Sequence, residues 1–498
     1  MKNNLLLLLL CLTGFNAGAQ SIFFQKIIGN SGSFYSRDVI QTADTGYVVC
    51  GSSSGLGDYT ANGFLMKLDK FGTRLWTKSY GGSNADWAMR VLEESDGSLV
   101  FAGYTNSTNN SGYDIWLAKT NSNGVLQWSR TYGGSDWDFG YSILKTNDGN
   151  YLIAGETYSF GNGNADGFLL KVDMNGDSLW MQTYGGPLNE NARKVITLPD
   201  GSFIFTGTTN SPPSTSKDIW LVKTDAMGAV VWDRRLGSAA DDEGQSIVLS
   251  RTNGEIVGVG STDSSYSTLN SDQYYFRTDD QGMLICHFLY GGPAEETTHD
   301  VCERWNGYGI VAGMTLSYGS GFGDMICYYP HNGCFWTGGQ TIGTPDRDEA
   351  WAVKETSDSG YVVVGQTENG PGFTNVYIVK AGPTMFVTPL LITEFDISSV
   401  DEVATTNSLE VYPNPFNGPI NISWYGREGR NRIRLFDISG KLIAEETLYG
   451  SNGTIEPDLS AKGIYFLEII NENSGERITR RIIKGRSEEH TSELQSPC

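Results

Sequence analysis

Residues 86–134, DWAMRVLEESDGSLVFAGYTNSTNNSGYDIWLAKTNSNGVLQWSRTYGG, contain four strand-sized runs separated by turn signals. The runs are WAMRVLEE, SLVFAGYT, DIWLAKTN and VLQWSRTY. Asp96-Gly97 joins the first two runs, and glycine supplies the positive φ that a tight hairpin requires. The stretch therefore predicts four antiparallel β-strands.

The same pattern repeats along most of the chain. Four tryptophans follow one another at intervals of 52 residues: Trp76, Trp128, Trp180 and Trp232. A glycine that ends an apolar run recurs in seven units, at Gly51, Gly103, Gly155, Gly207, Gly260, Gly313 and Gly365. Seven four-stranded units of this length predict an all-β fold, a seven-bladed β-propeller, because radial closure protects the sheet edges. We expect each tryptophan to pack between neighbouring blades.

The seventh unit provides only three strands of its own, within residues 348–382. The segment SIFFQKII at residues 21–28 matches the fourth-strand pattern and has no unit before it. We therefore expect the N-terminal strand to complete the last blade, and we place the propeller at residues 20–382.

The two ends of the chain have a different character. Residues 1–19 have the order of a secretory signal peptide, with Lys2, an apolar run and the small-residue stretch Ala17-Gly18-Ala19. Residues 383–407 lack the repeat landmarks and are interpreted as a linker. Residues 485–498 resemble the translation of a DNA-sequencing adapter and are interpreted as an artefact outside the fold.

Composition excludes some partners. The formal net charge of −22 and the absence of a basic stripe argue against nucleic acid. After the first nineteen residues no run of about 20 apolar residues occurs, so we expect no transmembrane helix.

The cysteines left several pairings open. One or two disulfides among Cys286, Cys302, Cys327 and Cys334 suit an oxidising compartment, and Cys327 with Cys334 could pair across a hairpin. Unpaired buried thiols are the alternative. Cys50 falls in an apolar strand and is interpreted as a core residue.

Acidic residues open six of the seven units, at Asp86, Asp138, Glu190, Asp242, Glu296 and Asp348. A second set precedes the third strand, at Asp114, Asp166, Asp218, Asp272 and Asp324. Recurrence in nearly every unit favours a structural role in turns over catalysis. Calcium binding by the oxygen-rich loops is kept as an alternative, although no EF-hand spacing is present; no other cofactor is expected.

No catalytic motif is found, and no catalytic residue is assigned. A site built from His299, Glu295 and Asp300 is kept as a hypothesis. The loops between the second and third strands vary while the rest repeats, and binding usually resides in such loops. Together with the unit-joining loops they predict a recognition face that includes Tyr59, Tyr113, Tyr158, Phe160, Tyr266, Tyr318 and Phe322.

Residues 408–484 carry another pattern of short strands, which predicts a small immunoglobulin-like β-sandwich. Here VYPNPF, LFDISGK, LSAKGIYFLEI and RRIIK closely resemble the type A C-terminal sorting domain of the type IX secretion system. The residues that carry the resemblance include Pro413, Asn414, Pro415, Asp437, Gly440, Gly463, Tyr465 and Lys484. The resemblance implies recognition by that secretion machinery, export through the periplasm and across an outer membrane, and release or attachment to surface lipopolysaccharide.

Two functions remain open for the repeat domain. The first is a secreted or surface-displayed binding module that recognises a glycan or a protein, for example in adhesion. The alternative is an extracellular polysaccharide hydrolase or lyase. Carboxylates clustered at the central channel would favour the enzyme, and turn-bound carboxylates would favour the binding module.

Overall fold

The computed structural model describes residues 23–29, 32–54, 61–107, 112–263, 270–304, 306–319, 321–369, 373–383 and 391–394 of the repeat region. In the C-terminal region it describes residues 409–412, 420–424, 430–437, 441–449, 452–455, 463–471 and 477–484. The predicted signal peptide and the 485–498 segment lie outside these ranges.

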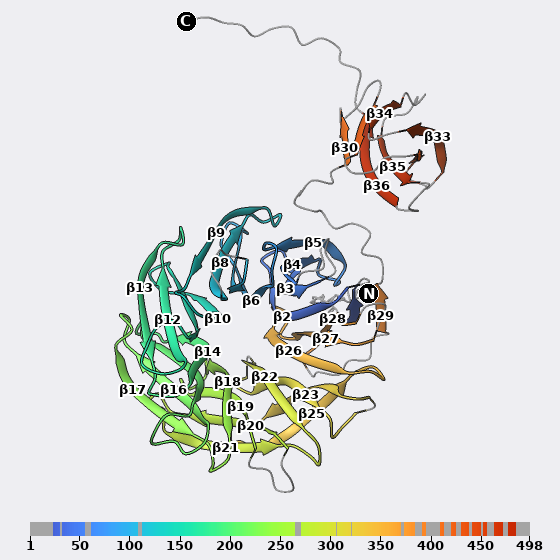
Figure 1. Cartoon of the computed structure of the whole chain (residues 1–498). Coiled ribbons are helices and arrows are strands. Elements are labelled where there is room, and N and C mark those ends of the chain that lie inside the picture. The colour runs from blue at the N-terminus through green and yellow to red at the C-terminus, as the bar shows by residue number, and fades with distance from the viewer. Residues whose placement is uncertain are drawn as a thin grey trace, which may run out of the picture. The chain divides into compact units, whose positions relative to one another are not determined.

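Seven antiparallel sheets surround a centre, as predicted (Figure 1). Blade 1 contains β2 (Phe34–Gln41), β3 (Tyr47–Ser53), β4 (Asn62–Leu68) and β5 (Arg74–Tyr80). Blade 2 contains β6 (Asp86–Glu93), β7 (Leu99–Thr105), β8 (Asp114–Thr120) and β9 (Leu126–Tyr132). Blade 3 contains β10 (Asp138–Lys145), β11 (Tyr151–Thr157), β12 (Asp166–Val172) and β13 (Ser178–Tyr184). Blade 4 contains β14 (Glu190–Thr197), β15 (Phe203–Thr209), β16 (Asp218–Thr224) and β17 (Val230–Leu236).

The remaining blades follow the same order. Blade 5 contains β18 (Asp242–Leu249), β19 (Ile256–Thr262), β20 (Asp272–Thr278) and β21 (Leu284–Tyr290). Blade 6 contains β22 (Glu296–Glu303), β23 (Gly309–Thr315), β24 (Asp324–Pro330) and β25 (Trp336–Ile342). Blade 7 contains β26 (Asp348–Glu355), β27 (Tyr361–Thr367), β28 (Asn375–Ala381) and the N-terminal strand β1 (Phe24–Ile28).

The N-terminal strand closes the ring, which confirms the prediction. β1 pairs antiparallel with β28, so that Phe24 lies opposite Lys380 and Ile28 opposite Val376. A further strand, β29 (Leu391–Glu394), pairs in parallel with the other edge of β1. β29 falls within the segment interpreted as a linker, so at least these four residues extend the last blade.

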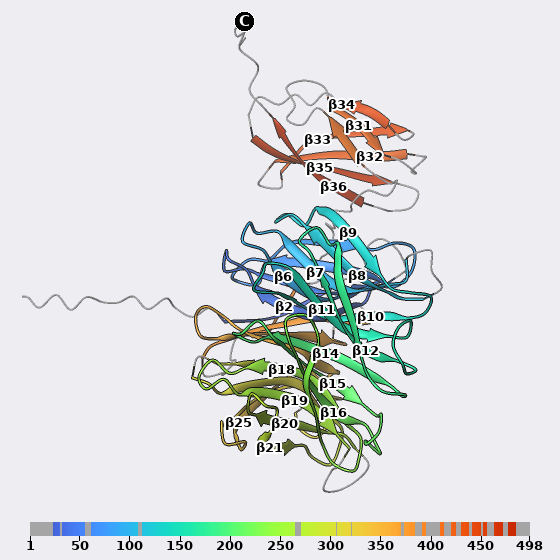
Figure 2. The same ribbon diagram turned by 90° about the vertical axis from the view of Figure 1, so that its left-hand side faces the viewer.

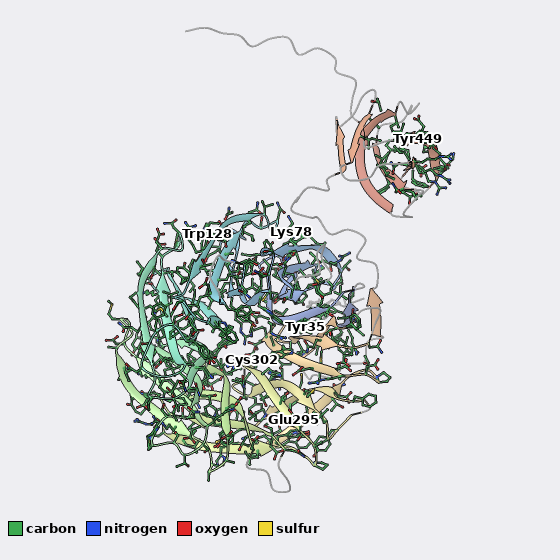
Figure 3. All side chains as sticks on the ribbon, in the orientation of Figure 1. Tyr35, Lys78, Trp128, Glu295, Cys302 and Tyr449 are labelled. Atoms are coloured by element: carbon green, nitrogen blue, oxygen red, sulfur yellow. A yellow bond between two sulfur atoms is a disulfide. The ribbon has the colours of Figure 1, made fainter. Side chains whose placement is uncertain are left out.

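Each inner strand (β2, β6, β10, β14, β18, β22 and β26) packs against the inner strand of the next blade, and β26 packs against β2. The middle strands are buried on both faces; for example, all seven residues of β12 are buried. Their apolar side chains form the cores between the sheets. Figure 2 views the ring from the side, and Figure 3 shows Cys302 near its middle and Trp128 at its outer edge.

One contact is repeated where neighbouring blades meet. The Tyr80 hydroxyl of blade 1 donates to the Gly124 carbonyl of blade 2 at 2.7 Å, and the Trp76 ring packs against the same turn. Gly124 has a φ of +71°, and a Cβ there would lie 2.8 Å from Trp76. Trp128, Trp180 and Trp232 pack in the same way on Gly176, Gly228 and Gly282. The tryptophans therefore lie between blades, as predicted.

One disulfide forms between two of the four cysteines that were expected to pair, but not in the suggested hairpin pair. Cys286 of blade 5 is bonded to Cys334 of blade 6, whereas Cys50, Cys302 and Cys327 are free and buried. Pairing of Cys327 with Cys334 was therefore wrong, because Cys327 is directed into the blade core. Cys286 is the third residue of its outer strand, the position of tryptophan in the earlier blades, and Cys334 occupies the turn position of the glycine. The disulfide thus replaces the Trp–Gly contact.

The chain divides into two compact units, Met1–Asp401 and Glu402–Cys498. In the second unit, one sheet contains β30 (Leu409–Tyr412), β31 (Ile420–Trp424) and β34 (Asn452–Ile455). The other contains β32 (Arg430–Asp437), β33 (Leu442–Tyr449), β35 (Gly463–Asn471) and β36 (Arg477–Lys484). Ile422 and Leu467 belong to one core shared by both sheets, so the unit is a β-sandwich.

Among the predicted sorting-domain residues, Tyr465 is buried in this core and Asp437 accepts a hydrogen bond from the Lys441 backbone N–H at 3.0 Å. Gly463 and Lys484 lie opposite each other in β35 and β36. Pro413, Asn414, Pro415 and Gly440 lie outside the described residues. The described part of the chain contains no helix long and apolar enough to cross a membrane.

Candidate binding site at the central channel

A β-bulge interrupts the pairing of every inner strand at the same place. In blade 1 the register shifts between Ser36 and Asp38, which leaves Arg37 as the extra residue. A bulge redirects side chains and commonly occurs next to functional sites. The seven bulged residues, one from each blade, are Arg37, Met89, Tyr141, Arg193, Gln245, His299 and Trp351.

These seven bulged residues and Arg90 line one pocket of about 50 Å³. The pocket lies where all seven blades meet, and we call the space around it the central channel. Because the pocket is lined by one residue from each blade, its composition differs around the ring although the backbone repeats. The backbone around the channel is therefore regular, whereas the side chains that line the pocket vary.

Charged residues that come shortly after the bulges along the inner strands form a buried ion network. Lys354 donates to Asp300 at 2.5 Å, and Arg90 lies 3.1 Å from Asp38. Lys194 is 4.0 Å from Asp300. Burial alone would raise the pKa of Asp300, but attraction to these cations outweighs it and holds the pKa well below its usual range. Asp300 is therefore a fixed negative charge.

Lys194 has the opposite balance in this network. Burial lowers its pKa to about 7, and repulsion from Arg90 adds to the shift despite attraction to Asp300. Arg90 and Lys354 keep raised pKa values because their carboxylate partners outweigh the effect of burial. Lys194 is therefore the cation of this network that loses its proton most easily.

Aromatic rings hold two of the bulged residues. The Arg37 guanidinium lies 3.8 Å from the centre of the Trp351 ring and 4.8 Å from that of Trp87. His299 stacks on Trp351, with ring centres 3.9 Å apart, and its Nε2 lies 2.8 Å from Glu349 Oε1. Burial acts to raise the pKa of Glu349, but the contact with His299 lowers it overall. These stacked groups have little rotational freedom.

His299 therefore has a different partner from the one hypothesised. Glu349 comes from the next blade, whereas Asp300 binds Lys354 and Arg90 in the ion network. His299 is the bulged residue and lies outside the register of the strand pairing, whereas Asp300 lies within it. The three-residue site of His299, Glu295 and Asp300 is thus not assembled.

A continuous set of aromatic contacts extends over blades 1 to 3. Tyr35 contacts Trp87, which stacks on Tyr104. Tyr104 contacts Tyr113 and Phe139, and both of these contact Trp137. Trp137 contacts Tyr158. We call this set, Tyr35, Trp87, Tyr104, Tyr113, Trp137, Phe139 and Tyr158, the aromatic rim.

Carboxylates occupy the side formed by blades 4 to 6. A second pocket of about 250 Å³ shares Gln245 and His299 with the channel pocket. Its lining includes the four carboxylates of Asp241, Glu243, Asp263 and Glu295. Glu243 is held by Lys217 at 2.6 Å. One side of the channel opening is therefore aromatic and the other is acidic.

The predicted recognition face is divided by this geometry. Tyr113 and Tyr158 belong to the aromatic rim. Phe160, Tyr318 and Phe322 are exposed by 44, 45 and 82%, and their rings do not contact the rim in the described part of the chain. Tyr59 and Tyr266 lie outside the described residues.

The two classes of loop predicted to share this face do contact each other. The backbone N–H of Asn84, in a unit-joining loop, donates to Ser107 Oγ at 3.0 Å, in the loop that follows the second strand. Asp136 contacts Ser159 in the same way in the next blade. These hydrogen bonds fix the base of the variable loops.

The recurrent acidic residues that open the units begin the inner strands, and their carboxylates bind the preceding turns. Asp86 accepts from the Gly82 backbone N–H at 2.8 Å and from Ser107 Oγ at 2.9 Å. Glu190 accepts from the Gly186 N–H at 2.7 Å in the equivalent place. Their carboxylates therefore satisfy backbone donors, the role that the turn interpretation assigns to them. Among the described residues, no group of three His, Cys, Asp or Glu side chains is arranged to hold a metal ion.

Among the bulged residues the sequence interpretation singled out only His299, and in the rim only Tyr113 and Tyr158. A signal was present, because every bulged residue follows the opening position of its unit by three residues. Alternation of buried and exposed positions does not reveal an inserted residue, so these positions were assigned simply to a strand. When the units are aligned, this column varies from blade to blade, and only arginine occurs in it twice.

Comparison with known proteins identifies the C-terminal unit. Residues 410–485 match the family described as "Secretion system C-terminal sorting domain". The regulatory protein FlaEY of Caulobacter vibrioides is 24% identical over 262 residues, which are 47% of this chain and 27% of FlaEY. The chain thus aligns with about a quarter of that protein.

Solved structures were also compared. PorZ, a surface component of the type IX secretion system of Porphyromonas gingivalis, is 14% identical, with a TM-score of 0.42 over 91% of this chain and 59% of PorZ. The β-propeller domain of the Trilobed protease from Pyrococcus furiosus is 10% identical, with a TM-score of 0.41 over 70% of this chain and 93% of that domain. By its own seven sheets and its matched C-terminal residues, the chain is a seven-bladed β-propeller with a type IX C-terminal sorting domain, exported by that system to the cell surface or the medium.

Proposed function

We propose that the propeller is a glycan-binding module that acts outside the cell. The observation that carries this proposal is the aromatic rim beside a pocket lined by four carboxylates. Flat aromatic faces stack on the apolar faces of sugar rings, and carboxylates accept hydrogen bonds from sugar hydroxyls. Recognition sites commonly combine apolar surface with a few well-placed polar groups.

Trp137 and Tyr158 are the rim residues best placed to meet a ligand. Their exposed fractions are 48 and 42%, and their rings contact each other at 6.3 Å between centroids. The half-buried ring of Tyr113 packs against Trp137, and that of Phe139 packs against Tyr158. Such a preorganised surface loses little conformational entropy when a ligand binds.

The experiment is a glycan array probed with the full mature chain, with and without calcium. We expect binding to a restricted set of polysaccharides and at least a tenfold loss of affinity in Trp137→Ala. Phe71→Ala is the matched control, because Phe71 is 53% exposed in the turn between β4 and β5, outside the rim. Equal losses in both variants, or binding to proteins alone, would contradict the proposal.

A polysaccharide lyase or hydrolase is the second candidate, because His299, which contacts Glu349, lines the same pocket as Tyr141. Histidine and tyrosine are groups that can transfer protons to and from a sugar. Asp38 and Asp300 do not support a two-carboxylate hydrolase, since both are occupied by cations. New reducing or unsaturated ends released from a bound glycan would favour this candidate.

A further inference from the structure

The bottom of the central channel carries more positive than negative charge. Arg37, Arg90 and Arg193 line the channel pocket, and no carboxylate of the described residues lines it. Arg90 pairs with Asp38 and Asp300. Glu349 is engaged with His299. This local excess contrasts with the net charge of −22 of the whole chain.

Arg37 and Arg193 are the cations without a carboxylate partner. Among the described residues, neither forms an ion pair, and both stack on aromatic rings instead. Arg193 lies 4.2 Å from the centre of the Tyr141 ring. Burial lowers the pKa of Arg37 only to about 10, so it is charged at neutral pH. Arg37 Nη1 donates to the Ser36 carbonyl at 3.0 Å, and stacking orients each planar guanidinium without using its other N–H groups.

Two further donors in this pocket are unsatisfied. The Arg90 Nε and Trp351 Nε1 atoms are buried and have no hydrogen-bond partner in the described structure. Both atoms carry an N–H, and both residues line the pocket. Buried donors are normally paired, so unpaired donors beside excess positive charge indicate a missing acceptor that is negatively charged.

We propose that Arg37, Arg193, Arg90 and Trp351 form a subsite for an oxyanion substituent, a carboxylate or a sulfate ester, on an acidic polysaccharide. The inference rests on the proposed function, because the sugar rings would lie on the aromatic rim above. The pocket of about 50 Å³ admits a group of a few heavy atoms rather than a sugar ring. Guanidinium groups bind carboxylate and sulfate oxygens in a planar, two-point geometry.

The acidic pocket gives this subsite selectivity. Its carboxylates, including Glu243 and Glu295, accept bonds from neutral hydroxyls and repel further anionic substituents. A polysaccharide with spaced anionic groups would then be preferred over one in which every position is charged.

The test is calorimetric titration of the full mature chain with three probes. These are a galacturonic acid hexasaccharide, the same hexasaccharide with its carboxyl groups methyl-esterified, and a sulfated galactan hexasaccharide. We expect the acid or the sulfated probe to bind at least tenfold more tightly than the ester, and the affinity to fall as salt is raised. The stronger of the two anionic probes identifies the group.

Arg37→Met and Arg193→Met should each remove at least tenfold of the affinity for the anionic probe and leave binding of the ester unchanged. Arg130→Met is the matched control, because Arg130 also lies over a tryptophan, 5.8 Å from the Trp128 ring, but on the outer strand. Thermal unfolding establishes that each variant is folded, and Arg37→Lys should retain part of the affinity.

The outcomes separate the two proposals. Equal binding of acid, sulfated and ester probes would overturn the oxyanion subsite while leaving glycan binding intact. Binding of anionic probes that neither Arg37→Met nor Arg193→Met affects would also overturn it. Failure of all three probes and of the whole array would overturn both proposals.

Discussion

The outer contacts between neighbouring blades, which we call seams, and the central channel arise from the same repeat. They differ in whether their residues are the same from blade to blade. At the seams, a tyrosine or tryptophan of one blade meets a turn glycine of the next, and this arrangement recurs from Trp76 to Trp232. At the channel, the same bulge recurs seven times with six different types of side chain, of which only arginine occurs twice. Repetition therefore marks what holds the ring together, and its absence marks where recognition can be encoded.

The largest expected effect tests whether the closing blade is equivalent to the others. Ile27→Asp places a carboxylate where the side chain is 0% exposed in the core formed with β28. A buried, unpaired charge in a core strand should cost about 4 kcal/mol or more of unfolding free energy. Denaturant unfolding of the full chain measures this.

Phe23→Asp is the control for closure, because Phe23 precedes β1 and is 47% exposed. It should change the unfolding free energy by less than about 0.5 kcal/mol. A small effect of Ile27→Asp would mean that the ring does not depend on its N-terminal strand.

The next largest effect is expected at the seam between blades 5 and 6, where a disulfide replaces the Trp–Gly contact. Replacing Cys286 and Cys334 by serine removes a crosslink across 48 residues and should cost about 2–4 kcal/mol. If the seam is otherwise ordinary, Cys286→Trp with Cys334→Gly should recover part of this loss by restoring the contact seen at Trp232 and Gly282. Unfolding with and without reductant distinguishes the variants, since only the wild type should respond to reductant.

How much of the fold could be predicted depends on how far apart in the sequence the contacting residues are. Blade number, strand order and N-terminal closure follow from the period, because Phe24 stands 52 residues before Trp76 and packs on Gly72 as Trp76 packs on Gly124. The disulfide was missed because Cys327 is nearer to Cys334 in sequence, although unit register places Cys286 opposite Cys334.

The channel network was beyond such reasoning. Asp300 meets Arg90, Lys194 and Lys354, which come from three other blades. These charges become neighbours only when the ring closes, and whether a carboxylate faces the channel depends on the bulge before it. Strand β29 was not expected either, since four residues in a parallel pairing give no periodic signal.

A third prediction tests whether the buried charges of the channel lower the free energy of unfolding. The pKa of Lys194 is about 7 in the folded chain and about 10.5 when unfolded, so between these values the unfolded state binds more protons. The unfolding free energy should therefore rise with pH over this interval. The groups that set this balance are Arg90, Lys354, Asp300 and Asp38.

Lys194→Met should remove that rise. Its advantage over the wild type should be largest below pH 7 and should shrink as the pH approaches 10. Chemical unfolding at a series of pH values measures the difference. A wild type whose pH dependence matches that of Lys194→Met would show that Lys194 titrates normally in the folded ring.

The smallest effect tests whether the seams act independently. Tyr80→Phe and Tyr184→Phe each remove one hydrogen bond, of 2.7 Å, to a turn carbonyl of the next blade. Each should cost about 1 kcal/mol. Because the two seams share no residue, the double variant should lose the sum within about 0.5 kcal/mol. A loss of unfolding free energy well above the sum would mean that strain at one seam reaches the other through the ring. The seams and the channel could then not be treated as separate parts of the molecule.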